Sequence, residues 1–137
     1  AKRMVDIPVP FFGVRGIRFL ARQLQGWPAR YGMKQANALV GHVVRMQEEI
    51  GTGGAGFRFM YAAFLQEAGE LLGNNALVQA SGQLGATGDR WREFAILGAQ
   101  LVKGRETGEG AYRKLAEILY DCAAQEEKIF TRIKSMA

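Results

Sequence analysis

The stretch GTGGAGFRFMYAAFLQEAGELLG, residues 51–73, decides the fold class that we predict for this chain. After a glycine-rich turn, its apolar residues recur at intervals of three and four positions, which is the spacing of one face of an α-helix. The residues on this face are Phe57, Met60, Tyr61, Phe64, Leu65, Ala68, Leu71 and Leu72. A face this wide is typical of a helix that is buried against several others. We therefore expect a soluble, all-α domain that is organised around this helix.

The same periodicity continues on both sides of this stretch. Gly73 and Asn74 are expected to end one helix and to cap the next. Glycines interrupt the helix that follows, so we expect a kink or break near Gly88. Short connections predict a helical bundle of about five helices with mainly antiparallel neighbours over residues 13–137. The expected helices cover residues 14–25, 29–50, 57–72, 76–102 and 111–135.

Residues 1–12 are expected to form an extended N-terminal arm. Pro8 and Pro10 are incompatible with a continuous helix in this segment. We expect the next two residues, Phe11 and Phe12, to lie against an apolar surface. Arm and bundle together are expected to form a single domain of 137 residues. The chain does not begin with Met, which fits a processed product, a trimmed chain or the C-terminal part of a longer protein; we expect the last of these.

The composition narrows the class of protein further. With 48% apolar and 23% charged residues, the chain is typical of globular proteins. No run approaches the roughly 20 apolar residues of a membrane span, and we expect no signal peptide. The single cysteine, Cys122, excludes an internal disulfide and favours a cytoplasmic protein.

The positive charge is concentrated in the first third of the chain. Residues 1–50 hold eight Lys or Arg residues and three Asp or Glu residues, so the whole net charge of +5 lies there. Arg15, Arg18 and Arg22 share one side of the first long helix. They form either a basic docking face for an acidic partner or an ordinary solvated helix face, and the sequence leaves both open.

The glycine-rich turn matches the G-x-G-x-x-G pattern of dinucleotide-binding proteins. That pattern requires a preceding strand and a βαβ unit, whereas a helical segment precedes this turn, so we do not expect a nucleotide site. A smaller role remains: free N–H groups of Gly53, Gly54 and Gly56, with Arg58 beside them, would form an anion-binding turn. A flexible hinge is the alternative.

Metal and nucleophilic chemistry are not expected in this chain. Zinc and di-iron sites need clusters of His, Cys or carboxylate ligands, and the chain has one histidine, His42. We expect His42 to be a partly buried helix residue. Cys122 lies on the apolar face of the last helix, where burial raises a thiol pKa, and nothing in the spacing pairs it with His42. We therefore predict no catalytic residue, no metal and no cofactor.

A second candidate segment is GDRWREFA, residues 88–95. One interpretation makes Asp89 a helix cap that forms an ion pair with Arg92. The other places Trp91 and Arg92 beside Arg58 and Tyr61 as the wall of a substrate- or partner-binding surface. The sequence leaves both interpretations open, and the predicted binding set is Arg58, Tyr61, Asp89, Trp91 and Arg92.

Three segments carry a resemblance to a known family. They are FFGVRGIRFLARQLQGWP (residues 11–28), GGAGFRFMYAAFLQEAGELLG (residues 53–73) and GDRWREFA. In this order they resemble the helical C-terminal domain of butirosin biosynthesis protein H-type proteins, a domain of unknown function. The resemblance implies a role in bacterial natural-product biosynthesis. It also implies acyl transfer from an acyl carrier protein to an amine, with the chemistry in a separate, papain-like N-terminal cysteine domain.

Two hypotheses about function follow. In the first, the chain is the non-catalytic helical domain of such an acyltransferase or cysteine-hydrolase-like enzyme. Its basic face would dock the carrier protein or the catalytic domain, and the predicted binding set would shape the substrate entrance. In the second, it is a self-associating interaction module without a small-molecule site, and Phe11 and Phe12 form the homodimer contact. Nucleic acid is not expected as a partner, because no stacking aromatics alternate with the basic residues.

Overall fold

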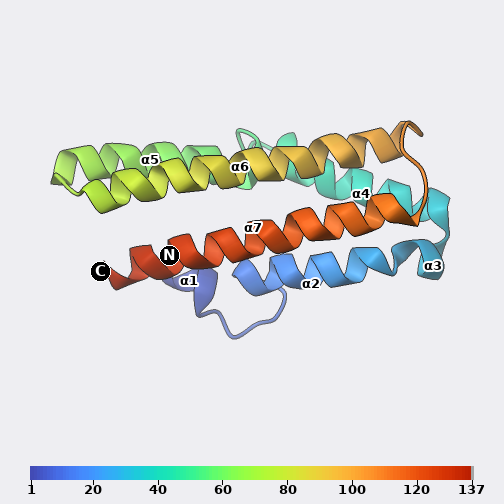
Figure 1. The fold of residues 1–137 in the computed structure, drawn as a ribbon, viewed down its shortest axis with the longest axis horizontal. Helices are drawn as coiled ribbons and strands as arrows, with labels where there is room; N and C mark the ends of the chain where they lie inside the picture. The colour runs from blue at the N-terminus through green and yellow to red at the C-terminus, as the bar shows by residue number, and fades with distance from the viewer. Residues whose placement is uncertain (137) are drawn as a thin grey trace.

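The computed structural model describes residues 1–136, and these residues form an all-helical protein without strands. Within them are seven α-helices and a short 3-10 helix, η1 (Figure 1). The α-helices are α1 (Lys2–Val5), α2 (Gly13–Gln25), α3 (Trp27–Tyr31), α4 (Met33–Glu48), α5 (Arg58–Leu72), α6 (Asn75–Val102) and α7 (Glu109–Ser135), and η1 covers Ala55–Phe57. The prediction of an all-α protein is confirmed.

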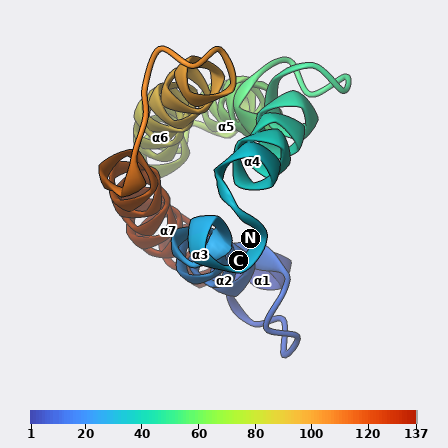
Figure 2. The same ribbon diagram turned by 90° about the vertical axis from the view of Figure 1, so that its right-hand side faces the viewer.

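The long helices lie along the long axis of the molecule (Figure 1). Helix α6 packs against α4, α5 and α7, and α7 packs in turn against α1 and α2. Seen end-on, α4, α6, α7 and α2 surround the centre of the molecule (Figure 2). Helices α6 and α7 therefore connect the fold, because every other long helix packs against one of them.

The core consists of two clusters of buried apolar side chains. The larger cluster joins α2, α4, α6 and α7 through residues such as Val14, Leu24, Val40, Phe94, Leu115 and Leu119. The smaller one joins α5, α6 and α7 through Ala62, Leu65, Ala80, Leu84, Ile129 and Phe130. Helices α6 and α7 contribute to both clusters, so burial of their apolar faces connects the two parts of the core.

Helix α5 is not the buried centre that its sequence predicts. Its buried residues are the small or narrow Ala62, Leu65 and Gly69, which face α6. The large apolar residues Phe57, Met60, Phe64, Leu71 and Leu72 are exposed, with Phe64 57% and Leu71 81% accessible. The expectation of central burial was wrong because α5 packs mainly against α6 and meets α7 near its own start, through Arg58 and Tyr61. The other side of its apolar face stays exposed.

The N-terminal segment also differs from the prediction. Lys2–Val5 form a helical turn instead of an extended arm. Phe11 and Phe12 are both exposed, although the Phe11 ring makes an edge contact with the Phe19 ring at 4.7 Å between centroids. The expected helix over residues 29–50 is two helices, α3 and α4, because Gly32 between them adopts a positive φ of 77°.

Local signals place the start of α6 correctly. Gly73 ends α5 with a φ of 60°, and the Asn74 side chain accepts hydrogen bonds from the N–H groups of Ala76 and Leu77. However, α6 continues unbroken through Gly88. A Cβ atom at Gly88 would lie 2.7 Å from the Phe59 ring, so this glycine permits close approach of α5 and α6 instead of breaking the helix.

Candidate functional site

Three side chains from three helices meet in a polar cluster between the two core clusters. Arg58 begins α5, Trp91 lies on α6 and Glu126 lies on α7. The Glu126 carboxylate is 0% exposed and accepts hydrogen bonds from Arg58 Nε (2.8 Å), Arg58 Nη2 (3.2 Å) and Trp91 Nε1 (2.7 Å). The Arg58 guanidinium also stacks over the Trp91 ring at 4.5 Å. We call these three residues the Arg58 cluster.

The turn before α5 fixes the position of Arg58. Gly56 and Phe57 both adopt left-handed backbone conformations, which turn the chain from η1 into α5. Arg58 Nη1 donates to the Gly56 carbonyl at 2.9 Å and so holds the turn against the guanidinium. Hydrogen bonds to Glu126 and to the Gly56 carbonyl, together with the Trp91 ring against one face, hold the guanidinium in one orientation.

A cavity of about 510 Å³ adjoins the Arg58 cluster. It is mostly apolar, and Arg58 carries the one charged side chain among the described residues that line it. Figure 2 shows α1 and α5 apart, and the cavity has lining residues from both, together with residues from α6 and α7. The lining residues are Ala1, Met4, Gly13, Gly56, Phe57, Arg58, Tyr61, Leu84 and Phe130.

Tyr61 connects the cavity to the exposed face of α5. Its ring lies 5.9 Å from the Phe130 ring, inside the second core cluster, and 5.8 Å from the Phe64 ring, on the exposed side. Aromatic pairs at these separations attract one another beyond their burial. The cavity and the exposed apolar face of α5 are therefore continuous.

The predicted binding set is only partly brought together. Arg58 and Tyr61 line the cavity, and the Trp91 ring stacks against the Arg58 guanidinium. Arg92 is instead exposed; its guanidinium lies 5.5 Å from the Phe59 ring centroid and 3.9 Å from the Glu48 carboxylate. Asp89 is also exposed, and it lies inside α6, so its predicted role as a helix cap is wrong.

Two N–H groups of the glycine-rich turn donate hydrogen bonds to side chains of the same chain. Gly54 N–H donates to Thr52 Oγ1 at 3.3 Å, and Ala55 N–H donates to Glu48 Oε1 at 3.1 Å. The carboxylate that the turn binds is therefore the chain's own. An external anion at Gly53, Gly54 and Gly56 stays a prediction, as does the hinge.

The three arginines of the predicted basic face differ in their surroundings. Arg18 donates two hydrogen bonds to the Glu127 carboxylate on α7, at 3.2 and 2.6 Å, and these bonds raise the pKa of Arg18 and lower the pKa of Glu127. Arg15 and Arg22 are exposed on α2. Docking of a partner on this face stays a prediction, with Arg15 and Arg22 as its accessible charges.

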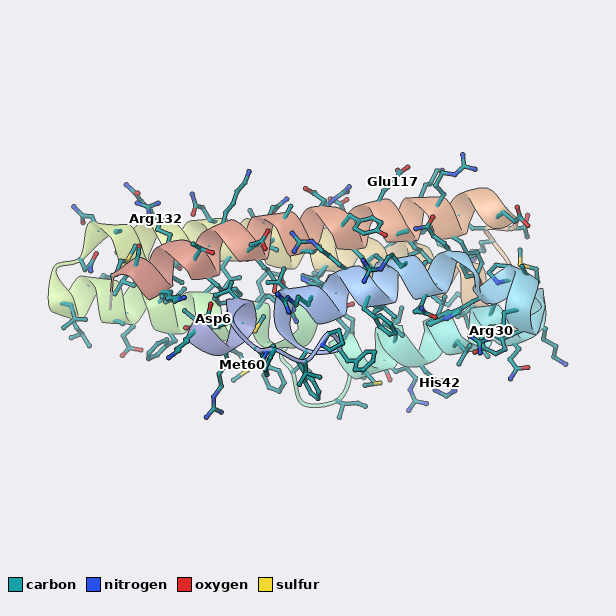
Figure 3. The ribbon with its side chains drawn as sticks, turned by 90° about the horizontal axis from the view of Figure 1, so that it is seen from below. Asp6, Arg30, His42, Met60, Glu117 and Arg132 are labelled. Atoms are coloured by element: carbon teal, nitrogen blue, oxygen red, sulfur yellow. The ribbon has the colours of Figure 1, made fainter. Side chains whose placement is uncertain are left out.

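Cys122 and His42 lie in different environments. Cys122 is fully buried in the larger core cluster, and burial, with the nearby charges of Glu126 and Asp121, raises its pKa from 9.0 to about 12. His42 is exposed and points away from the helices (Figure 3), so its expected partial burial was wrong. Within residues 1–136, no group of three or more His, Cys, Asp or Glu residues is placed to hold a metal ion.

Glu126 is the residue of this site that our sequence prediction missed. The apolar face of α7 includes Leu115, Leu119, Cys122 and Ile129, and Glu126 falls on the same face, four residues after Cys122. A carboxylate in such a series must find a partner when the helix is buried. That signal was present in the sequence, although it does not say which of the 18 Lys and Arg residues is the partner.

A comparison with protein-family models identifies a match over almost the whole chain. A family model described as a domain of unknown function, DUF4872, matches residues 1–133. Searches of curated proteins and of solved structures find no match. Among residues 1–136, no helix combines the length and apolar character needed to cross a membrane.

Proposed function

The chain belongs to the DUF4872 family, and from this premise we propose that it is a non-catalytic helical domain that docks onto a separate catalytic domain. The catalytic partner that we propose is a cysteine-containing domain of a bacterial acyl-transfer system, as the resemblance to butirosin biosynthesis protein H-type proteins implies. The helices would then form a mainly antiparallel bundle that serves as a scaffold. A cytoplasmic location agrees with the single, buried cysteine.

The exposed apolar face of α5 is the observation that supports docking. Met60, Phe64 and Leu71 lie four and seven positions apart along one side of the helix and are all exposed. Leaving large apolar side chains in water forfeits about 1.5–3 kcal/mol for each one that a partner could bury. Contiguous apolar patches of this kind mark interaction surfaces in soluble proteins.

Binding to a papain-like cysteine domain of the kind that the resemblance implies tests this function directly. Phe64→Glu places a charge in the middle of the apolar face, and we expect it to weaken binding in calorimetry at least about tenfold, since about 1.4 kcal/mol corresponds to tenfold. Ile96→Glu is the matched control, because Ile96 on α6 is 60% exposed, close to the 57% of Phe64. Failure of the native chain to bind, or equal losses in the two variants, would contradict docking through α5.

We also propose that an acyl carrier protein associates through the exposed charges of α2. Arg15→Glu and Arg22→Glu together should slow association in a salt-dependent way, because surface charges chiefly steer encounter. Arg18 is left unchanged because it holds Glu127. An association rate that these changes leave unaffected at low salt would contradict binding of the carrier protein through α2.

Self-association is the second candidate, and the same exposed face supports it together with Phe11 and Phe12. Two copies would cover one another's apolar residues across a two-fold axis. Sedimentation of the isolated chain separates the candidates: a dimer that Phe64→Glu dissociates favours self-association. A monomer at all concentrations argues against it and leaves docking to the cysteine domain in place.

A further inference from the structure

We propose that the cavity beside Arg58 binds an uncharged, mainly apolar small molecule that presents one carbonyl oxygen to the Arg58 guanidinium. This ligand site goes beyond the docking function and does not depend on a partner protein. It follows from the size of the cavity, from the side chains that line it and from the hydrogen bonds that Arg58 already makes.

The size and lining of the cavity suit an organic ligand. Its volume of about 510 Å³ lies within the range of about 300–1,000 Å³ typical of small-molecule sites. Met4, Leu84, Phe130 and Tyr61 line it with apolar surface from four different helices. Such sites combine mostly apolar walls with a few well-placed polar groups that orient the ligand.

Arg58 is the polar group that can orient a ligand here. A guanidinium has five N–H donors. The hydrogen bonds among residues 1–136 use Nε–H, one N–H of Nη1 and one of Nη2, in bonds to Glu126 and to the Gly56 carbonyl. One N–H on each terminal nitrogen therefore remains for a ligand. Because Glu126 and Trp91 hold the guanidinium in place, little conformational entropy is lost when a ligand binds.

The charges of the cluster select an uncharged ligand. Glu126 is fully buried and already balances the positive charge of Arg58. A ligand carboxylate would lose its hydration on entering the apolar cavity. It would also have to share the Arg58 guanidinium with the Glu126 carboxylate, and both effects cost binding free energy. A ligand ammonium would face the Arg58 charge and find no acceptor on that group. An amide or ester carbonyl can accept hydrogen bonds from the free N–H groups without the desolvation of a carboxylate or the repulsion of an ammonium group.

Three ligands with the same eight-carbon chain test this inference: octanamide, octanoate and octylammonium, each at about pH 7, where the last two are charged. Each is titrated into the native chain against N-phenyl-1-naphthylamine, an uncharged fluorescent apolar probe without a carbonyl. We expect the probe to bind and octanamide to displace it at least tenfold more strongly than either charged ligand. Absence of octanamide binding up to about 1 mM, or tighter binding of octanoate, would overturn the proposal.

Methyl resonances of methionine locate the bound ligand. Met4 lines the cavity, whereas Met33 and Met46 lie exposed on α4 and serve as internal controls. In spectra of the ¹³C-methyl-labelled chain, octanamide should shift the Met4 signal and leave the Met33 and Met46 signals in place. Shifts at Met33 or Met46 without a shift at Met4 would show binding elsewhere and would overturn the assignment.

A double variant tests the role of the guanidinium. Arg58→Met with Glu126→Gln removes both charges together, so that neither is left buried alone. It should still bind the probe but lose at least tenfold in octanamide affinity. Retention of full octanamide affinity would overturn the role of Arg58. If the double variant does not fold, the native chain's ligand ranking and Met4 shift still decide the proposal. Since no partner is present, these results are independent of docking through α5.

Discussion

Replacing Glu126 by Gln removes one negative charge from the interior while keeping nearly the same side-chain size. In the native chain the carboxylate accepts three hydrogen bonds, two of them from Arg58. The Gln amide NH₂ cannot accept from Arg58 Nη2, so one charge-assisted bond is lost, and such a bond contributes about 1.5–3 kcal/mol. The guanidinium, whose side chain is only 19% exposed, also loses its counter-charge.

These losses together predict that Glu126→Gln lowers the free energy of unfolding by about 3 kcal/mol, within the range measured for broken buried pairs. For a domain of this length, the corresponding decrease in Tm is about 10 °C. Urea denaturation followed by far-UV circular dichroism measures the first quantity, and calorimetry measures the second. In a double-mutant cycle with Arg58→Met, the two changes should couple by at least about 1 kcal/mol, because the residues are in contact.

Glu127 provides the matched control, because it is the next residue on the same helix and also binds an arginine with two hydrogen bonds. It is 51% exposed, so Glu127→Gln should cost no more than about 1 kcal/mol. The bonds from Arg18 lower the pKa of Glu127 below 4.5, so its contribution is present above pH 4.5 and lost as the pH falls through the lowered pKa. Equal costs for the two variants at neutral pH would refute the reasoning that burial makes the Glu126 pair strong.

Three further predictions concern packing, reactivity and the surface. Gly88→Ala should lower the free energy of unfolding by about 1–3 kcal/mol, because its Cβ would meet the Phe59 ring at 2.7 Å. Gly85 lies on the same helix, but a Cβ atom there would meet no atom within 4 Å. Gly85→Ala should therefore raise the free energy of unfolding by up to about 1 kcal/mol, as measured by urea denaturation. Cys122 should react with Ellman's reagent at pH 8 only after unfolding, since raising its pKa from 9.0 to about 12 reduces the thiolate fraction about 1,000-fold; fast reaction of the folded chain would show that the thiol is accessible. Leu71→Ser should change the free energy of unfolding by less than about 0.5 kcal/mol, because Leu71 is exposed, and a larger loss would show that α5 is covered in solution.

The candidate site was only partly predictable. Arg58, which the sequence places beside the glycine-rich turn, and Tyr61, a member of the same predicted binding set, both line the cavity. Trp91 was placed with them and does contact Arg58. The prediction also puts Arg92, the next residue in the sequence, on this surface. Successive residues point in different directions around a helix, and Arg92 lies beside Glu48 instead.

The all-helical class and most helix ends could be predicted from the residues alone, because they depend on interactions between residues a few positions apart. The Asn74 cap and the left-handed Gly73 are examples, since each acts on the backbone within three or five residues. The packing of the helices, in contrast, determines which apolar faces are covered and which charges are paired. Phe64 is exposed because of where α5 packs, and Arg58 meets Glu126 across 68 positions of sequence. Both outcomes depend on how separate helices share a limited core, and that is a property of the whole packed chain.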